Sequence, residues 1–162
     1  MTVRLRPHHL LCMLTYAGKG YSPAFTANMT VVVGRIAGGE PVEIVEGPDD
    51  ICKPLLSEPD PHCYRESVQV RDRRASQDVG QLLGVSISAG ELPALTEGRL
   101  DMLRQAFRDG DIRAACRDGD IRAACRDCEW QELCGRIADN AFSGTALREA
   151  GRHDIPPRDR QP

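Results

Sequence analysis

Seven cysteines, five of them confined to two short stretches, restrict most strongly how these 162 residues can fold. Three of the five follow the pattern C-x2-C-x5-C, at Cys125, Cys128 and Cys134. The other two, Cys52 and Cys63, lie more than 60 residues upstream. Anything that draws these thiols together must therefore join distant parts of the chain.

The compartment decides what clustered cysteines can do. No apolar stretch approaches the roughly 20 residues that cross a bilayer, and the run from Leu10 to Leu14 is too short for a signal peptide. We therefore expect a cytoplasmic protein that does not enter a membrane. Thiols stay reduced there, so the cysteines indicate metal binding or redox chemistry rather than disulfides. The formal net charge of −3 argues against a nucleic-acid partner.

The C-terminal cysteines have a spacing that suits a metal centre. Two intervening residues allow Cys125 and Cys128 to turn toward one point, and about one and a half helical turns then bring Cys134 back to it. Trp130 and Leu133 would pack away from solvent and keep water off the site. The pattern therefore predicts three thiolates at one centre.

Iron–sulfur clusters usually take four thiolates, so one ligand remains to be found. It would come from Cys52, Cys63 or, less favourably, Cys12, and the turn sequence at 47–50 favours Cys52 slightly. We expect a 4Fe–4S rather than a 2Fe–2S cluster. Zinc is the alternative, since His62 and Cys63 offer both of its preferred ligand types. Buried cysteines without a metal are a third interpretation.

A second group of candidate ligands stands near the N-terminus, at His8, His9 and Cys12. On a helix, His8 and Cys12 share a face because they are four residues apart. They could bind metal or form a thiolate–imidazole pair. The simpler interpretation is that the histidines cap and pack at a helix start while Cys12 lies in the core, because no third orienting group is evident.

The hydrophobic pattern predicts a mainly α fold, α+β only through a small strand element. We expect a single compact domain over residues 1–151 and a flexible tail over 152–162. Ser22 and Pro23 indicate a helix start, and Thr96 another. The periodicity predicts helices over 8–16, 23–37, 71–83 and 97–107, a strand over 42–46, and a long loop over 47–67 that a metal would organise.

Two adjacent nine-residue blocks, 108–116 and 117–125, both read RDGDIRAAC. Known structural repeats run roughly 20 to 50 residues, so this indicates a tandem duplication. A continuous helix through one copy would rotate the next residues by about half a turn, and we therefore expect one copy to bulge out. Only the second copy completes C-x2-C, which makes Cys116 a spare.

Three separated motifs occur in an order that resembles a known family. They read RPHHLLCMLTYAGKGYSPAF from Arg6, EGPDDIC from Glu46 and CRDCEWQELC from Cys125. Together they resemble the bacterial and archaeal family named domain of unknown function 1284, over most of residues 4–147. The duplication departs from that family's pattern.

That resemblance implies iron–sulfur binding with no assigned reaction. It implies a role for His8, His9 and Cys12, and metal ligation by the remaining cysteines other than Cys116: Cys52, Cys63, Cys125, Cys128 and Cys134.

Three functions are open as hypotheses. The first is a small iron–sulfur protein in electron transfer or regulation, acting with a redox or protein partner that the sequence does not identify. The second is a zinc-stabilised adaptor without a redox role. The third is a metal-dependent enzyme that uses His8, His9 and Cys12 beside the metal.

Overall fold

The computed structural model describes residues 1–109, 124–125 and 128–147. Within these ranges the chain is mainly helical, with a sheet of two short strands, which confirms the expected fold class. The elements in chain order are β1 Val3–Leu5, α1 His9–Thr15, α2 Pro23–Ala37, β2 Val42–Ile44, the 3-10 turns η1 Lys53–Leu55 and η2 His62–Tyr64, α3 Glu66–Leu83, α4 Glu97–Asp109 and α5 Gln131–Asp139.

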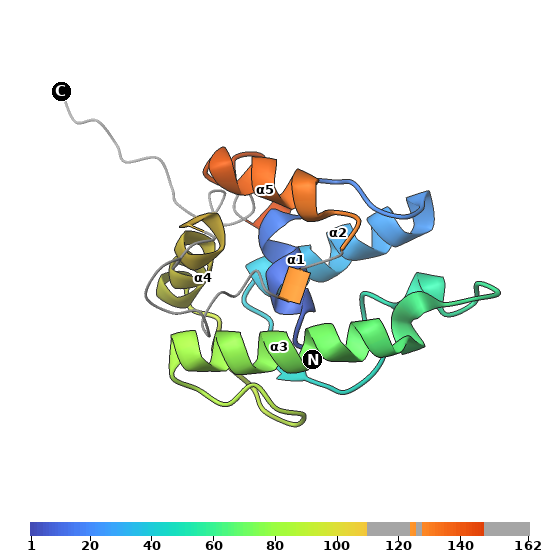
Figure 1. The fold of residues 1–162 in the computed structure, drawn as a ribbon, viewed down its shortest axis with the longest axis horizontal. Coiled ribbons are helices and arrows are strands. Elements are labelled where there is room, and N and C mark those ends of the chain that lie inside the picture. The colour runs from blue at the N-terminus through green and yellow to red at the C-terminus, as the bar shows by residue number, and fades with distance from the viewer. Residues whose placement is uncertain (110–123, 126–127, 148–162) are drawn as a thin grey trace.

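The short helix α1 lies in the middle of the fold, with the longer helices around it (Figure 1). It packs against α4 and α5. Leu10, Leu11, Met13 and Leu14 are almost fully buried, because the run is apolar on nearly every side. This burial brings the start of α1, with its two histidines, into the interior.

The helix α2 begins and ends where the sequence predicts. The backbone N–H of Phe25 donates to Oγ of Ser22 at 3.1 Å, and Pro23 occupies the first turn. The residues expected at helical spacing, from Phe25 to Ile36, are buried. In α4 the backbone N–H of Arg99 likewise donates to Oγ1 of Thr96 at 3.3 Å, as expected for a capped start.

The sheet contains a strand that the sequence analysis missed. β1 pairs in parallel with β2, with Val3 opposite Val42 and Leu5 opposite Ile44, and α1 and α2 form the connection between them. β2 ends at Ile44 rather than at residue 46. Because β1 leads directly into Arg6 and α1, the sheet fixes the direction from which the N-terminal motif enters the core.

The prediction of one long loop over 47–67 is wrong in part. The segment contains η1 and η2, and α3 begins at Glu66 rather than at residue 71. Ordinary hydrogen bonds hold it: the backbone N–H of Arg4 donates to Oδ2 of Asp50 at 2.8 Å, and the amide of Asn28 donates to the Asp50 carbonyl at 2.8 Å. These bonds tie the start of the segment to β1 and α2.

Some sequence predictions fall outside the described residues. α4 extends to Asp109, just inside the first copy of the duplicated block, but the predicted bulge, Cys116 and the tail at 152–162 lie beyond the residues that the structure describes. Of the helices in the described ranges, none is both long and apolar enough to cross a membrane.

Candidate metal centre

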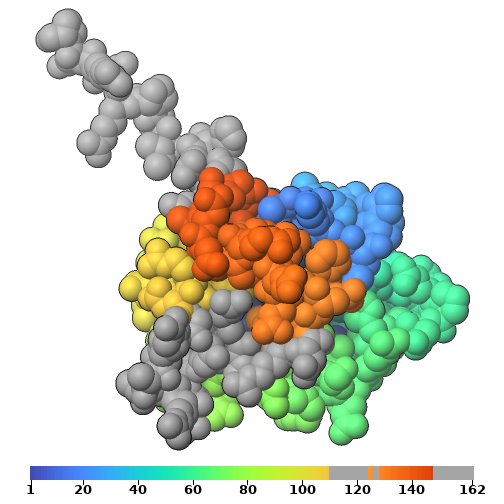
Figure 2. Space-filling model, turned by 45° about the horizontal axis from the view of Figure 1, so that its top comes forward, coloured from blue at the N-terminus to red at the C-terminus, as the bar shows by residue number. Residues whose placement is uncertain are grey.

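A single cavity of about 320 Å³ brings the described cysteines together. None of these cysteines is in a disulfide. They come from α1, from the residue that precedes η1, from η2, and from the C-terminal segment that begins at residue 124. Figure 2 shows that segment, in orange to red, on one face of the molecule, bordering on α4 and on the blue N-terminal elements. The cysteines on the cavity wall are Cys12, Cys52, Cys63, Cys125, Cys128 and Cys134.

The two upstream cysteines form the buried side of the cavity. Cys52 and Cys63 are 2% and 3% exposed. Burial raises the pKa of the Cys52 thiol far above its usual range, and the nearby Asp49 charge adds to the rise. The thiol is therefore protonated at neutral pH unless a metal replaces the proton.

The turn before Cys52 is fixed, as its sequence indicated. Oδ1 of Asp49 accepts hydrogen bonds from the backbone N–H groups of Ile51 and Cys52, at 3.0 and 3.1 Å. Oδ2 accepts from the backbone N–H of Arg6 at 2.7 Å. Asp49 thus ties the turn to the chain just after β1.

Cys125 and Cys128 precede α5, and Cys134 lies in its first turn. The backbone N–H of Cys128 donates to the Cys125 carbonyl at 3.1 Å, and that of Cys134 donates to the Trp130 carbonyl at 2.9 Å. The hydroxyl of Thr15, in α1, also donates to Sγ of Cys134 at 3.1 Å. All three cysteines are half-buried, and Trp130 and Leu133 line the same cavity.

Cys12 lies beside the C-terminal cysteines. Burial raises the pKa of its thiol well above the usual value, and the charges of Cys125, Cys134 and Cys128, in that order, raise it further. An uncoordinated Cys12 is therefore a poor nucleophile, because reactive cysteines need a lowered pKa.

Among the residues that the structure describes, two groups of three potential metal ligands have their ligand atoms within 4.8 Å of one another: His8, His9 and Cys12, and His9, Asp49 and Cys52. Within the described residues, the C-terminal cysteines join no such group. Two sulfurs on one zinc ion can be at most about 4.6 Å apart, twice the Zn–S distance of about 2.3 Å. Sulfurs that bind different irons of one cluster are not held to that limit.

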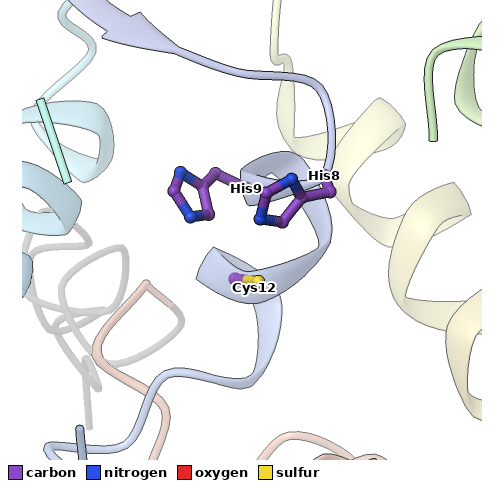
Figure 3. A group of neighbouring side chains, drawn as sticks. All are labelled: His8, His9 and Cys12. Carbon is purple, nitrogen blue, oxygen red and sulfur yellow. The ribbon is translucent and has the colours of Figure 1, made fainter. Parts of the chain in front are cut away.

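Each of the two histidines is oriented by a carboxylate, and their rings lie side by side at the start of α1 near Cys12 (Figure 3). Nδ1 of His8 lies 2.7 Å from Oδ1 of Asp72, and Nδ1 of His9 lies 2.6 Å from Oδ2 of Asp49. The ring centroids are 4.3 Å apart. His8 makes no side-chain cap, so the expectation that the histidines cap the helix is wrong for His8.

These contacts set the charges of the pair and its partners. Burial lowers the pKa of His8 to about 4, and the neighbouring His9 acts in the same direction against the attraction of Asp72. For Asp49, burial works to raise the pKa, but the charge and hydrogen bond of His9 lower it to about 2. At neutral pH, His8 is therefore neutral and Asp49 is ionised.

Asp72 is the site residue that the sequence analysis missed. It lies within the run RDRR at 71–74, and such a charged run is typical of a helix face exposed to solvent. A signal existed nonetheless: Val68, Ala75 and Val79 are buried, and position 72 falls on the same face of α3. Oδ2 of Asp72 accepts from Nε and Nη2 of the buried Arg6, so the group that orients His8 lies 64 residues further along the chain.

Three ring-bearing side chains on the cavity wall contact one another. The ring of Tyr21 lies 5.4 Å from that of Trp130 and 4.9 Å from that of His62, measured between centroids. Burial raises the pKa of Tyr21 well above its usual range. The Trp130 ring thus lines the cavity in contact with Tyr21, while its role in keeping water off the site stays a prediction.

The family model described as "Protein of unknown function (DUF1284)" matches residues 20–134, more than half of the chain. The chain belongs to this family. The matched region of this DUF1284 protein includes the cysteines from Cys52 to Cys134 and begins after Cys12. No curated protein and no solved structure matches the chain.

Proposed function

We propose that this DUF1284 protein binds an iron–sulfur cluster, of the 4Fe–4S kind, in the thiol-lined cavity. Cys125, Cys128 and Cys134 would supply three ligands, and Cys52 or Cys63 the fourth. The observation that carries the proposal is the meeting of cysteines from three distant parts of the chain on one cavity wall. When bound, such a cluster supplies one-electron transfer, and the protein would act in electron transfer or as a redox sensor.

The cavity and its donors fit such a group. A cavity needs roughly 10–15 Å³ to hold one water molecule, so about 320 Å³ leaves room for a polyatomic cofactor. Thiolates are the ligands that iron–sulfur clusters take. Arg6 and Arg71 also line the cavity, and their positive charges would offset part of the negative charge of a cluster with its thiolates.

The spacing of the sulfurs favours a cluster over a single zinc ion at these cysteines. A zinc site needs its thiolates within about 4.6 Å of one another, and the described C-terminal cysteines form no group of three that tight. A cluster distributes its ligands over several irons. A zinc-stabilised adaptor is therefore the weaker alternative.

The test is metal analysis after anaerobic purification. We expect brown wild-type protein that contains iron and sulfide in equal amounts, and a Cys128→Ala variant that loses both. Cys116→Ala, which alters the spare cysteine of the duplicated block, is the matched control and should keep both. Colourless protein with stoichiometric zinc at the cysteines would overturn the proposal.

A metal-dependent enzyme is the second candidate, and one observation favours it. His8 and His9 are held by carboxylates and border the cavity, an arrangement that metal-dependent hydrolases use to position their ligands. The test is hydrolysis of p-nitrophenyl esters and phosphates by wild-type and His9→Ala protein. Equal rates for both proteins would exclude the enzyme hypothesis for these substrates.

A further inference from the structure

We infer that this protein has a second metal site, in which His8, His9 and Cys12 hold a single divalent ion of the zinc class. This site is separate from the cysteines assigned to the cluster. It does not require the cluster, because none of its ligands is among Cys52, Cys63, Cys125, Cys128 and Cys134.

The three donor atoms are already close in the folded protein. They lie within 4.8 Å of one another. His8 is the N-cap of α1, His9 is its first residue, and Cys12 lies within the first helical turn. One short element therefore carries all three ligands, and the packing of α1 into the core fixes its position.

Hydrogen bonds hold both imidazoles in the orientation that metal binding needs. Each Nδ1 faces a carboxylate, at 2.7 Å for His8 and 2.6 Å for His9. The Nε2 atoms are thus the nitrogens left to bind an ion. Metal-binding histidines almost always carry such a carboxylate or carbonyl on the other nitrogen, which fixes the tautomer and the ring plane.

The two carboxylates are themselves fixed. Asp72 accepts two hydrogen bonds from the guanidinium of Arg6, which is 1% exposed, and one from the backbone N–H of His8 at 3.2 Å. Asp49 accepts backbone hydrogen bonds on both of its oxygens. Neither carboxylate can swing away without breaking several bonds, so the imidazoles are pre-positioned.

The overlapping group of His9, Asp49 and Cys52 is a weaker choice for the ion. Both oxygens of Asp49 are occupied by N–H donors, and Oδ2 is the atom that orients His9. An ion there would have to displace these bonds. Asp49 therefore orients the His9 ring by its contact with Nδ1 and does not itself serve as a ligand.

Two imidazoles and a thiolate are the donors that zinc prefers. A set of three protein ligands leaves one position open, which is the pattern of zinc sites that act on a bound water or substrate. All three residues also line the cavity, so the open position would face its interior.

The experiment compares the full chain with His8→Ala, His9→Ala and, as the matched control, His62→Ala. His62 lies on the same cavity wall but belongs to neither group of close donors. Each protein is purified anaerobically, given a slight excess of Zn²⁺ and desalted, and zinc, iron and sulfide are then measured per chain. We expect His8→Ala and His9→Ala to hold one zinc fewer than wild type and His62→Ala, with iron and sulfide unchanged.

Equal zinc content in all four proteins would contradict the proposed site. Loss of iron together with zinc in His8→Ala or His9→Ala would also contradict it, because the histidines would then be cluster ligands. Absence of iron and sulfide from every protein overturns the proposed function but leaves the difference in zinc decisive for this site.

Two further variants test the site if an alanine variant fails to fold. Asp72→Asn should weaken Zn²⁺ binding by about 10- to 100-fold without removing a ligand. Cys12→Ser should abolish the thiolate-to-metal absorption of the Co²⁺-loaded protein while leaving iron in place. Unchanged Zn²⁺ affinity in the first, or unchanged Co²⁺ absorption in the second, contradicts the assignment.

Discussion

The guanidinium of Arg6 donates from both Nε and Nη2 to a single oxygen of Asp72, at 2.8 and 2.6 Å, in the interior of the protein. The other oxygen of Asp72, Oδ1, lies 2.7 Å from Nδ1 of His8. Nη1 of Arg6 also donates to the Cys63 carbonyl at 2.9 Å. One buried cation therefore joins α3, the segment before α1 and a cysteine turn.

Removing that cation should be strongly destabilising. Arg6→Met leaves Asp72 and the Cys63 carbonyl without their main donor, and breaking a buried ion pair on one side costs about 3–5 kcal/mol. Arg65→Met is the matched control, because its pair with Asp60 is 56% and 80% exposed and contributes about 0–1 kcal/mol. Urea unfolding of the two variants measures both losses, and similar losses would contradict the structural role of Arg6.

Acid should destabilise the metal-free protein through His8. Its pKa is about 4 in the folded state and near 6.5 when unfolded, so between these values the unfolded chain binds the extra proton. Stability is full above about pH 6.5 and falls as the pH drops toward 4, by about 3 kcal/mol from this residue.

The check is urea unfolding of chelator-treated protein at several pH values. His8→Gln cannot take up the proton and should show a shallower loss over the same window. Parallel pH profiles for the two proteins would mean that His8 is not the group responsible.

Metal removal should loosen the C-terminal helix first. In α5 only Ala138 is fully buried, whereas α2 buries five side chains. Under the proposed function, chelation should therefore speed amide exchange over Gln131–Asp139 much more than over α2. Hydrogen exchange with mass spectrometry measures both helices in one sample, and uniform loss of protection would contradict a local role for the metal.

The Thr15 hydroxyl should tune the potential of the proposed cluster. It donates to Sγ of Cys134, and hydrogen bonds to cluster sulfurs stabilise the more negative, reduced state. Thr15→Val should lower the midpoint potential by up to about 60 mV, the one-electron equivalent of a tenfold change. Thr26→Val, in α2, is the control. An unchanged potential in Thr15→Val would show that this bond does not reach the redox centre.

Replacing either of two helical glycines with alanine should change the stability of the protein, in opposite directions for the two sites. A Cβ at Gly34, in α2, meets nothing within 4 Å, so Gly34→Ala should stabilise the protein by about 0.5–1 kcal/mol. A Cβ at Gly80, in α3, would lie 2.9 Å from the Val85 carbonyl oxygen, and crowding of this kind costs about 1–3 kcal/mol. Thermal unfolding of the two variants gives the sign of each effect.

Local sequence patterns predicted α2 and α4 well, because each helix has a recognisable capping residue and apolar residues at helical spacing. They did not predict β1, since three residues are too few to show alternation and the strand exists only through its pairing with β2. The early start of α3 was missed because Arg65 provides no side-chain cap.

The residues of the candidate site were likewise predicted only in part. Cysteine spacing was enough to single out residues that line one cavity. The carboxylates of Asp49 and Asp72 were not recognised as partners of His9 and His8, because that relationship depends on how β1, α1 and α3 meet in space.

The helix α1 has seven residues, fewer than the roughly 12–15 that an isolated helix needs to persist in water. Its shape is therefore imposed by its neighbours. A genetic screen for loss of metal should accordingly return substitutions at Leu10, Leu11 and Leu14, apolar positions whose side chains offer an ion no donor atom. If the proposed site binds its ion as inferred, substitutions that disturb core packing around α1 and substitutions that lower metal affinity would fall at the same positions.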